Sequence, residues 1–219
     1  MSHRHWNRSS QMATFMSHTP PHQPGGPWSE PVRIPTADCQ DPPFNATHFC
    51  LDSNLAVVIA RNGSLLGMGR GALYTATDWR DPASYAFHPT SGAGGEDPFV
   101  YWDARSPPVL HMLRHTGRDT QQTAPNATRG NHGAHYFSTD GGAQWSSVPG
   151  ALAYGCEVAY TDGSSECVIM RERPHLVFGT DGTTPLALST AAMHGPPVAP
   201  GTFAQNRTSF TLVQALAQQ

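Results

Sequence analysis

The sequence lacks lysine: all 13 of its basic residues are arginine, which we attribute to coding bias rather than to function. Charged residues are also scarce, at 13% of the chain, and the formal net charge is −3. Such a chain has no basic field with which to attract nucleic acid. It contains no apolar run long enough for a transmembrane helix, and no segment keeps a helical hydrophobic period for long. We therefore expect neither nucleic acid nor a membrane as a partner, and no helical architecture.

Glycine and proline, by contrast, are abundant, with 21 and 20 residues in a chain of 219. The apolar stretches are short and are bounded by Gly, Pro, Asn and Asp, which is typical of strands joined by tight turns. At this length the chain is able to bury a core of its own. The composition therefore predicts an all-β fold.

The four cysteines form two close pairs in the sequence, Cys39/Cys50 and Cys156/Cys167. Neither a CxxC motif nor a His/Cys ligand spacing is present, which argues against a zinc site. We expect two local disulfides, each closing one loop. Five glycosylation sequons accompany them and favour an extracellular or secretory-pathway location. The sequons begin at Asn7, Asn45, Asn62, Asn126 and Asn206.

The amino terminus fits that location less well. Residues 1–10 are polar, and no apolar run of signal-peptide length follows them. Two interpretations stay open at this point: either the secretory location is wrong, or the chain lacks its natural beginning.

The short strands recur in a repeated unit. One unit has two apolar runs separated by Asn62-Gly63, and an Asn-Gly dipeptide between such runs is a strong hairpin signal. Four strands per unit, with a small polar turn before the last strand, are typical of a propeller blade. A β-sandwich also has short strands and regular turns and is the alternative. We predict one N-terminally incomplete β-propeller domain over 1–219, with a partial first blade at 1–34 and further blades at 53–90, 96–150 and 172–214.

One of these turns carries a known pattern. The segment 138–145 matches the S-x-D-x-G-x-x-W pattern of the Asp box, which is found in sialidases and other propellers. In those proteins Ser and Asp brace the turn between the third and fourth strands, and Trp packs between blades. The match supports a propeller without choosing its chemistry. A sialidase-like protein would also need an arginine triad and a tyrosine nucleophile, which the sequence does not identify.

Two strands open on an acidic motif that contains a proline, Glu96-Asp97-Pro98 and Arg171-Glu172-Arg173-Pro174. Repeats that radiate from one axis bring such positions together, so the carboxylates are candidates for chemistry. Each carboxylate also has a purely structural interpretation. Asp97 is then a turn residue that accepts backbone hydrogen bonds, and Glu172 is a carboxylate paired with arginine. Which of Glu96 and Asp97 faces the axis is left open by the sequence. Strand alternation allows the two arginines to point away from Glu172.

With these motifs the sequence resembles the five-bladed β-propeller glycoside hydrolases of the family 43 and family 32 superfamily, over roughly Trp6 to Val213. The resemblance rests on the Glu-Asp-Pro-Phe-Val opening at 96–100, the strand at 133–138, and the motif at 171–174. It implies inverting hydrolysis of glycosidic bonds by acids that surround a central funnel. In such a mechanism the acid and base carboxyls stand about 6.5–9.5 Å apart.

The resemblance also implies roles for single residues. Asp97 matches the Asp that orients its neighbours, and Glu172 matches the general acid, which has to be protonated near neutral pH. The first-blade Asp, the general base of the family, has no counterpart, because its strand would precede Met1. Core or turn packing is the alternative for the histidine and tryptophan among the substrate-binding candidates. Those candidates are Glu96, Trp102, His135 and Arg173.

The implied partner is a polysaccharide or oligosaccharide substrate, bound by a monomer. No cofactor and no catalytic metal are implied, and a structural calcium ion in the central channel is compatible with the resemblance. The competing interpretation is a propeller that binds carbohydrate without hydrolysing it, or a pseudo-enzyme. The missing first-blade Asp favours that second interpretation.

Overall fold

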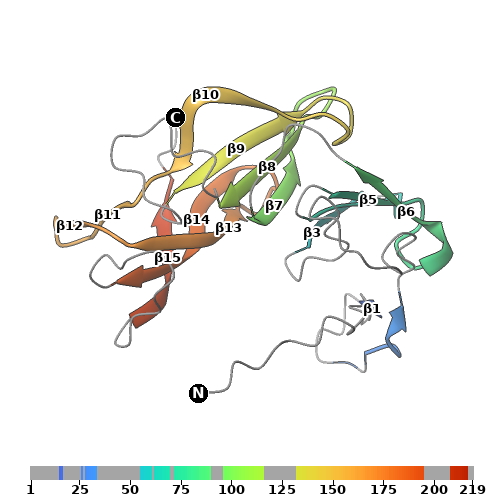
Figure 1. Ribbon diagram of the computed structural model, residues 1–219, viewed down its shortest axis with the longest axis horizontal. Coiled ribbons are helices and arrows are strands. Elements are labelled where there is room, and N and C mark those ends of the chain that lie inside the picture. Colours follow the sequence, from blue (N-terminus) through green and yellow to red (C-terminus); the bar gives the residue numbers. More distant parts are fainter. Residues whose placement is uncertain are drawn as a thin grey trace, which may run out of the picture.

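The computed structural model describes residues 15–16, 26, 28–33, 55–60, 62–69, 72–89, 96–115, 132–194 and 208–216. These residues form β-strands joined by turns, with one 3₁₀ turn, η1 (Pro82–Ser84). The predicted all-β class is confirmed (Figure 1). None of the described segments is a helix of the length and apolar character that a membrane crossing requires.

Three antiparallel sheets follow one another along the chain, and the strands of each lie in sequence order. The first contains β3 (Ala56–Ile59), β4 (Leu65–Met68), β5 (Ala72–Ala76) and β6 (Tyr85–Pro89). The second contains β7 (Glu96–Trp102), β8 (Leu110–His115), β9 (Gly133–Ser138) and β10 (Ser146–Tyr154). The third contains β13 (Met170–Phe178), β14 (Pro185–His194) and β15 (Thr208–Ala215).

The sheets are arranged as consecutive blades of a propeller. Strand β3 of the first sheet contacts β7 of the second, and β7 contacts β13 of the third, so the first strands of the sheets lie together. Sequential meanders packed in this way are the propeller pattern, and Figure 1 shows the three sheets next to one another. From 1–34, β1 (Phe15–Met16) and β2 (Val32–Arg33) form an antiparallel pair. The exact blade boundaries stay a prediction.

The hairpin predicted at Asn62-Gly63 joins β3 to β4. Gly63 has a φ of 87°, a left-handed conformation that glycine adopts without steric cost. Its N–H donates to the carbonyl of Ala60 at 2.9 Å. The Oδ1 atom of Asn62 accepts a bond from the backbone N–H of Ser64 at 3.0 Å. Both residues of the Asn-Gly dipeptide therefore stabilise this turn, Gly63 by its backbone conformation and Asn62 by its side-chain hydrogen bond.

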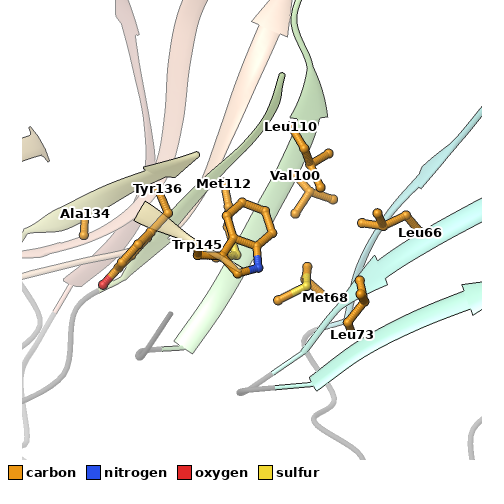
Figure 2. Packing of buried hydrophobic residues seen from close by; sticks show 9 residues of the cluster. All are labelled: Leu66, Met68, Leu73, Val100, Leu110, Met112, Ala134, Tyr136 and Trp145. Atoms are coloured by element: carbon orange, nitrogen blue, oxygen red, sulfur yellow. The ribbon is translucent and has the colours of Figure 1, made fainter. Parts of the chain in front are cut away.

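The first core lies between the first and second sheets, and Figure 2 shows the side chains of the two sheets facing each other. Met68, Leu110 and Met112 are fully buried in it. Each side chain of this size contributes roughly 1.5–3 kcal/mol when it leaves water. The cluster consists of Leu66, Met68, Leu73, Val100, Leu110, Met112, Ala134, Tyr136 and Trp145.

The Asp-box turn connects β9 to β10 and takes the predicted form. Ser138 Oγ donates to Asp140 Oδ1 at 2.8 Å and accepts the N–H of Gly142 at 2.8 Å. Asp140 Oδ1 also accepts the N–H of Gln144 at 3.0 Å. The turn places Trp145 in the core between the two sheets. Its structural role, a brace that delivers a tryptophan between blades, is confirmed.

A second core joins the second sheet to the third through Leu113, Tyr154 and Leu188. Beside it, a hairpin of β11 (Glu157–Ala159) and β12 (Ser165–Cys167) packs against the third sheet. The expected disulfide between Cys156 and Cys167 closes this hairpin, with Cα atoms 4.7 Å apart. The other expected pair, Cys39 and Cys50, lies outside the described residues, as do four of the sequons, Asn7, Asn45, Asn126 and Asn206.

Candidate functional site

β7 and β13 are the first strands of the second and third sheets, and each has a bulge near its amino-terminal end, which we call its opening. Between Glu96 and Phe99, β7 carries one extra residue relative to β8, and β13 carries one between Glu172 and His175 relative to β14. The residue before the proline is left-handed in both cases, with φ of 50° at Asp97 and 54° at Arg173. Left-handed non-glycine residues cost about 1–3 kcal/mol and cluster at functional sites.

This repeat fixes which residues correspond. The prolines Pro98 and Pro174 align, so the equivalent of Asp97 is Arg173, and the equivalent of Glu172 is Glu96. The carboxylate that recurs at the same place in both blades is therefore the glutamate. Asp97 and Arg173 instead form a pair of opposite charge at equivalent positions.

The two left-handed residues meet in space. Arg173 Nε lies 3.9 Å from Asp97 Oδ2, which makes an ion pair between the second and third sheets. Asp97 is only 6% exposed, whereas the Arg173 side chain is 66% exposed. A buried carboxylate needs such a partner, because leaving water without one costs several kcal/mol. Asp97, Glu172 and Arg173 are thus brought together at adjacent openings.

Arg171, two residues earlier, is buried and points elsewhere. Its guanidinium donates to Thr190 Oγ1 at 3.2 Å, to the carbonyl of Gly155 at 2.9 Å and to Gln214 Oε1. It also lies over the ring of Tyr154, 4.8 Å from the centroid. The expectation that strand alternation turns Arg171 away from Glu172 agrees with this geometry.

Tyr154, at the end of β10, is the centre of the cluster. Burial raises the pKa of its hydroxyl well above the usual range; the charge of Arg171 opposes this, and those of Asp97 and Glu172 add to it. Both carboxylates therefore lie within electrostatic range of one hydroxyl. Its Oη donates to the carbonyl of Arg171 at 3.4 Å.

The ring of Tyr154 fits because residue 133 has no side chain. A Cβ atom at Gly133 would lie 2.1 Å from Tyr154 Cε1, far inside van der Waals contact. Gly133 therefore permits the tyrosine to cover Arg171. No local sequence signal identifies this trio, because its members come from β9, β10 and β13 and meet only in the packed sheets.

Two predicted substrate-binding residues lie elsewhere. Trp102 ends β7, at the opposite end from Asp97, and packs against the first core, as the core alternative expected. His135 lies on β9, opposite Leu113 of β8, and bonds to His111 rather than lining the openings. Glu96 begins β7 opposite His115. The substrate-binding roles of all these residues stay predictions.

Among the residues that the structure describes, no group of three or more His, Cys, Asp or Glu side chains is arranged to hold a metal ion. The expected compatibility with a channel calcium ion therefore stays a prediction.

Comparison with protein-family models and with curated proteins gives no match. Among solved structures, this chain is similar to one described as "Crystal structure of a GH43_12 retrieved from capybara gut metagenome", with 13% sequence identity and a TM-score of 0.40. The match covers 65% of this chain and 25% of that one, so the similar part is about a quarter of that protein. This is a distant likeness in fold and assigns no activity.

Proposed function

We propose that this chain is a glycoside hydrolase-like propeller that acts on a polysaccharide or oligosaccharide, with its site at the openings of β7 and β13. The observation that supports the proposal is the ion pair between the sheets, with 3.9 Å between Asp97 Oδ2 and Arg173 Nε. Glu172 is the neighbour of Arg173 in the chain. Two carboxylates and a guanidinium from two blades are therefore gathered at one place, and these are groups that bind sugar hydroxyls and protonate glycosidic oxygens.

In this proposal Glu172 is the general acid. It is partly exposed, and its neighbour Arg171 is engaged on the other side of the strand. It gives its proton to the glycosidic oxygen while water attacks the anomeric carbon from the opposite face, and the proton that the attacking water loses passes to the solvent. Asp97 pairs with Arg173 and orients that guanidinium toward the substrate.

A second candidate function is carbohydrate binding without hydrolysis. It is favoured by the burial of Asp97, because a carboxylate that is 6% exposed and already paired is better suited to holding Arg173 than to reacting. In this case the exposed guanidinium of Arg173 is the main contact to the sugar.

Hydrolysis of aryl glycosides by the full chain and by its Glu172→Gln variant tests the proposal. We expect Glu172→Gln to lower kcat/KM by at least about 100-fold, the usual contribution of a general acid. Glu157→Gln, an exposed carboxylate on the β11–β12 hairpin, is the matched control and should retain the wild-type rate. Equal rates for Glu172→Gln and wild type would exclude the acid role.

Calorimetric titration with oligosaccharides separates the two candidates. Binding without turnover, weakened by Arg173→Gln, identifies the binding module. If a broad panel of plant-type and algal-type oligosaccharides is neither bound nor hydrolysed, both candidate functions are contradicted.

We also propose that the chain works outside the cytosol. The Cys156–Cys167 disulfide supports this, because disulfides persist mainly in oxidising compartments. Mass spectrometry of the natural protein should find this disulfide-linked peptide and a glycan on Asn62, which is exposed in the β3–β4 turn. A reduced pair together with an unmodified Asn62 would contradict the assignment.

A further inference from the structure

A second group of polar side chains lies away from the openings. Asp103 follows β7, His111 lies on β8 and His135 on β9. Asp103 Oδ2 is 3.1 Å from His111 Nε2, and His111 Nδ1 is 2.8 Å from His135 Nε2. The three side chains form a continuous hydrogen-bonded chain from a carboxylate through one imidazole to a second.

Neighbouring residues fix the positions of Asp103 and His111 in this hydrogen-bonded series. Asp103 also accepts the N–H of Val109 at 2.8 Å and a bond from Arg105 Nε. Its partial burial acts to raise the pKa, but the hydrogen bonds from Val109, Arg105 and His111 outweigh it and keep the pKa of Asp103 well below its usual range. The ring of Tyr101 stacks on His111 at 5.1 Å between centroids. The orientation of His135 is therefore set by neighbours that are themselves fixed.

His135 lines a cavity of about 250 Å³ between the second and third sheets. The walls are largely aliphatic, with Leu113 from the second sheet and Leu176 and Leu188 from the third. Of the residues that line it, only Tyr101 and His135 carry polar side-chain atoms. A dry apolar cavity of about 150 Å³ is enough to hold benzene, so this one has room for a substituted ring.

The hydrogen-bonded chain determines what His135 offers to that space. The ionised carboxylate of Asp103 only accepts, so His111 Nε2 carries a proton and its Nδ1 carries a lone pair. Arg105 Nη2, 3.2 Å from the same Nε2, does not reverse this, because the Arg105 side chain is largely exposed and free to bond water.

It follows that His135 Nε2 donates to His111 Nδ1, and that His135 Nδ1 carries a lone pair. Burial lowers the pKa of His135, which favours its neutral ring. Among the described residues, Nδ1 of His135 has no hydrogen-bond partner. The residues that line the cavity thus offer the Nδ1 acceptor of His135 and the hydroxyl of Tyr101 among otherwise apolar side chains.

We propose that this cavity is a binding site for a small monocyclic aromatic alcohol of the phenol class. The ring of the ligand fills the space between the leucine side chains and Tyr101, and its hydroxyl donates a hydrogen bond to Nδ1 of His135. Aromatic rings favour such offset contacts with a tyrosine. The site is separate from the β7 and β13 openings, and it does not depend on glycosidase activity.

Titration of the isotope-labelled full chain with phenol, anisole and toluene, followed by the leucine methyl resonances in NMR spectra, tests the proposal. The three ligands share the ring, but only phenol donates a hydrogen bond. We expect saturable shifts of Leu113, Leu176 and Leu188 methyls and a Kd for phenol about tenfold lower than for the other two, the value of one hydrogen bond. Absence of saturation, shifts confined to other residues, or equal Kd values for phenol and toluene would overturn it.

Variants locate the acceptor. His135→Phe keeps a ring but removes the lone pair, so the preference for phenol over toluene should fall to within about threefold while toluene still binds. Asp103→Asn should weaken the preference as well, because it removes the ionised acceptor that fixes the tautomer. His88→Gln is the matched control, an exposed histidine on β6 that bonds Thr75, and it should leave the preference unchanged. If His135→Phe does not fold, the ligand series on the wild-type chain decides alone.

Discussion

The openings of β7 and β13 have the same backbone and opposite charges. Both place a left-handed residue before a proline, with φ of 50° at Asp97 and 54° at Arg173. Yet Asp97 is 6% exposed and Arg173 is 66% exposed, and the two form an ion pair with each other. The left-handed backbone before the proline therefore repeats in the two blades, while the side chain at that position differs. A propeller that packs equivalent positions side by side thereby makes a complementary pair.

The largest effect is expected from removing the arginine that anchors β13. Arg171→Ala leaves Gly155, Thr190 and Gln214 without their buried donor and opens a cavity under Tyr154. It should lower the free energy of unfolding by about 3–4 kcal/mol. Urea unfolding measures this, with Arg173→Ala as the control two positions along the strand, where exposure limits the loss to about 1 kcal/mol. Equal losses of unfolding free energy for the two variants would contradict the description of Arg171 as the buried anchor and of Arg173 as the exposed partner in an ion pair.

The next effect should come from Gly133, which gives Tyr154 the space to cover Arg171. Gly133→Ala places a methyl group 2.1 Å from Tyr154 Cε1, so the ring has to move. Overpacking of this kind costs about 1–3 kcal/mol. Thermal unfolding should show the loss, and Gly155→Ala, where a Cβ atom meets nothing within 4 Å, should be close to neutral. The same Gly133→Ala change in a Tyr154→Ala background should cost clearly less; an undiminished cost there would show that the tyrosine is not the obstacle.

A smaller pair of effects on stability should differ in size. A left-handed conformation costs a non-glycine residue about 1–2 kcal/mol, and glycine escapes most of this. Arg173→Gly should be close to neutral, because relief of the left-handed conformation is offset by the loss of the pair with Asp97 and by the entropic cost of glycine. Asp97→Gly should be destabilising by about 1 kcal/mol or more, because it removes a buried ion-paired carboxylate. Denaturant midpoints that shift in the same direction by the same amount would show that the two openings do not differ as described.

Much of the fold could be predicted from local sequence. The Asn62-Gly63 dipeptide and the Ser138–Trp145 pattern each fix a turn through contacts within a few residues, and both turns form as expected. The Cys156–Cys167 disulfide is also local. These features could be found because the interactions that make them lie within one short segment.

The candidate site could be predicted only in part. Asp97, Glu172 and Arg173 are candidates because of the recurring acidic motif and the family resemblance, but the sequence alone does not show that Asp97 corresponds to Arg173 or that the two pair. That correspondence depends on a bulge, and a left-handed residue before a proline has no sequence signal of its own. Aligning the two prolines would have suggested it.

The predicted contact of His135 with a sugar stays a prediction, and the structure adds that His135 is hydrogen-bonded to His111. Tyr154 was not identified at all, because its role depends on contacts among three separate strands. Residues whose function is set by packing between sheets leave no periodic pattern to read.

We propose that the openings of two blades form one site through Asp97 and Arg173. A double-mutant cycle of Asp97→Asn and Arg173→Gln, measured by urea unfolding of the single and double variants, tests it directly. We predict a coupling energy of about 1 kcal/mol, with Arg173→Gln nearly neutral once Asp97 is already Asn. Losses of stability that add within about 0.3 kcal/mol would show that Asp97 and Arg173 do not interact, and would contradict a site shared by the two blades.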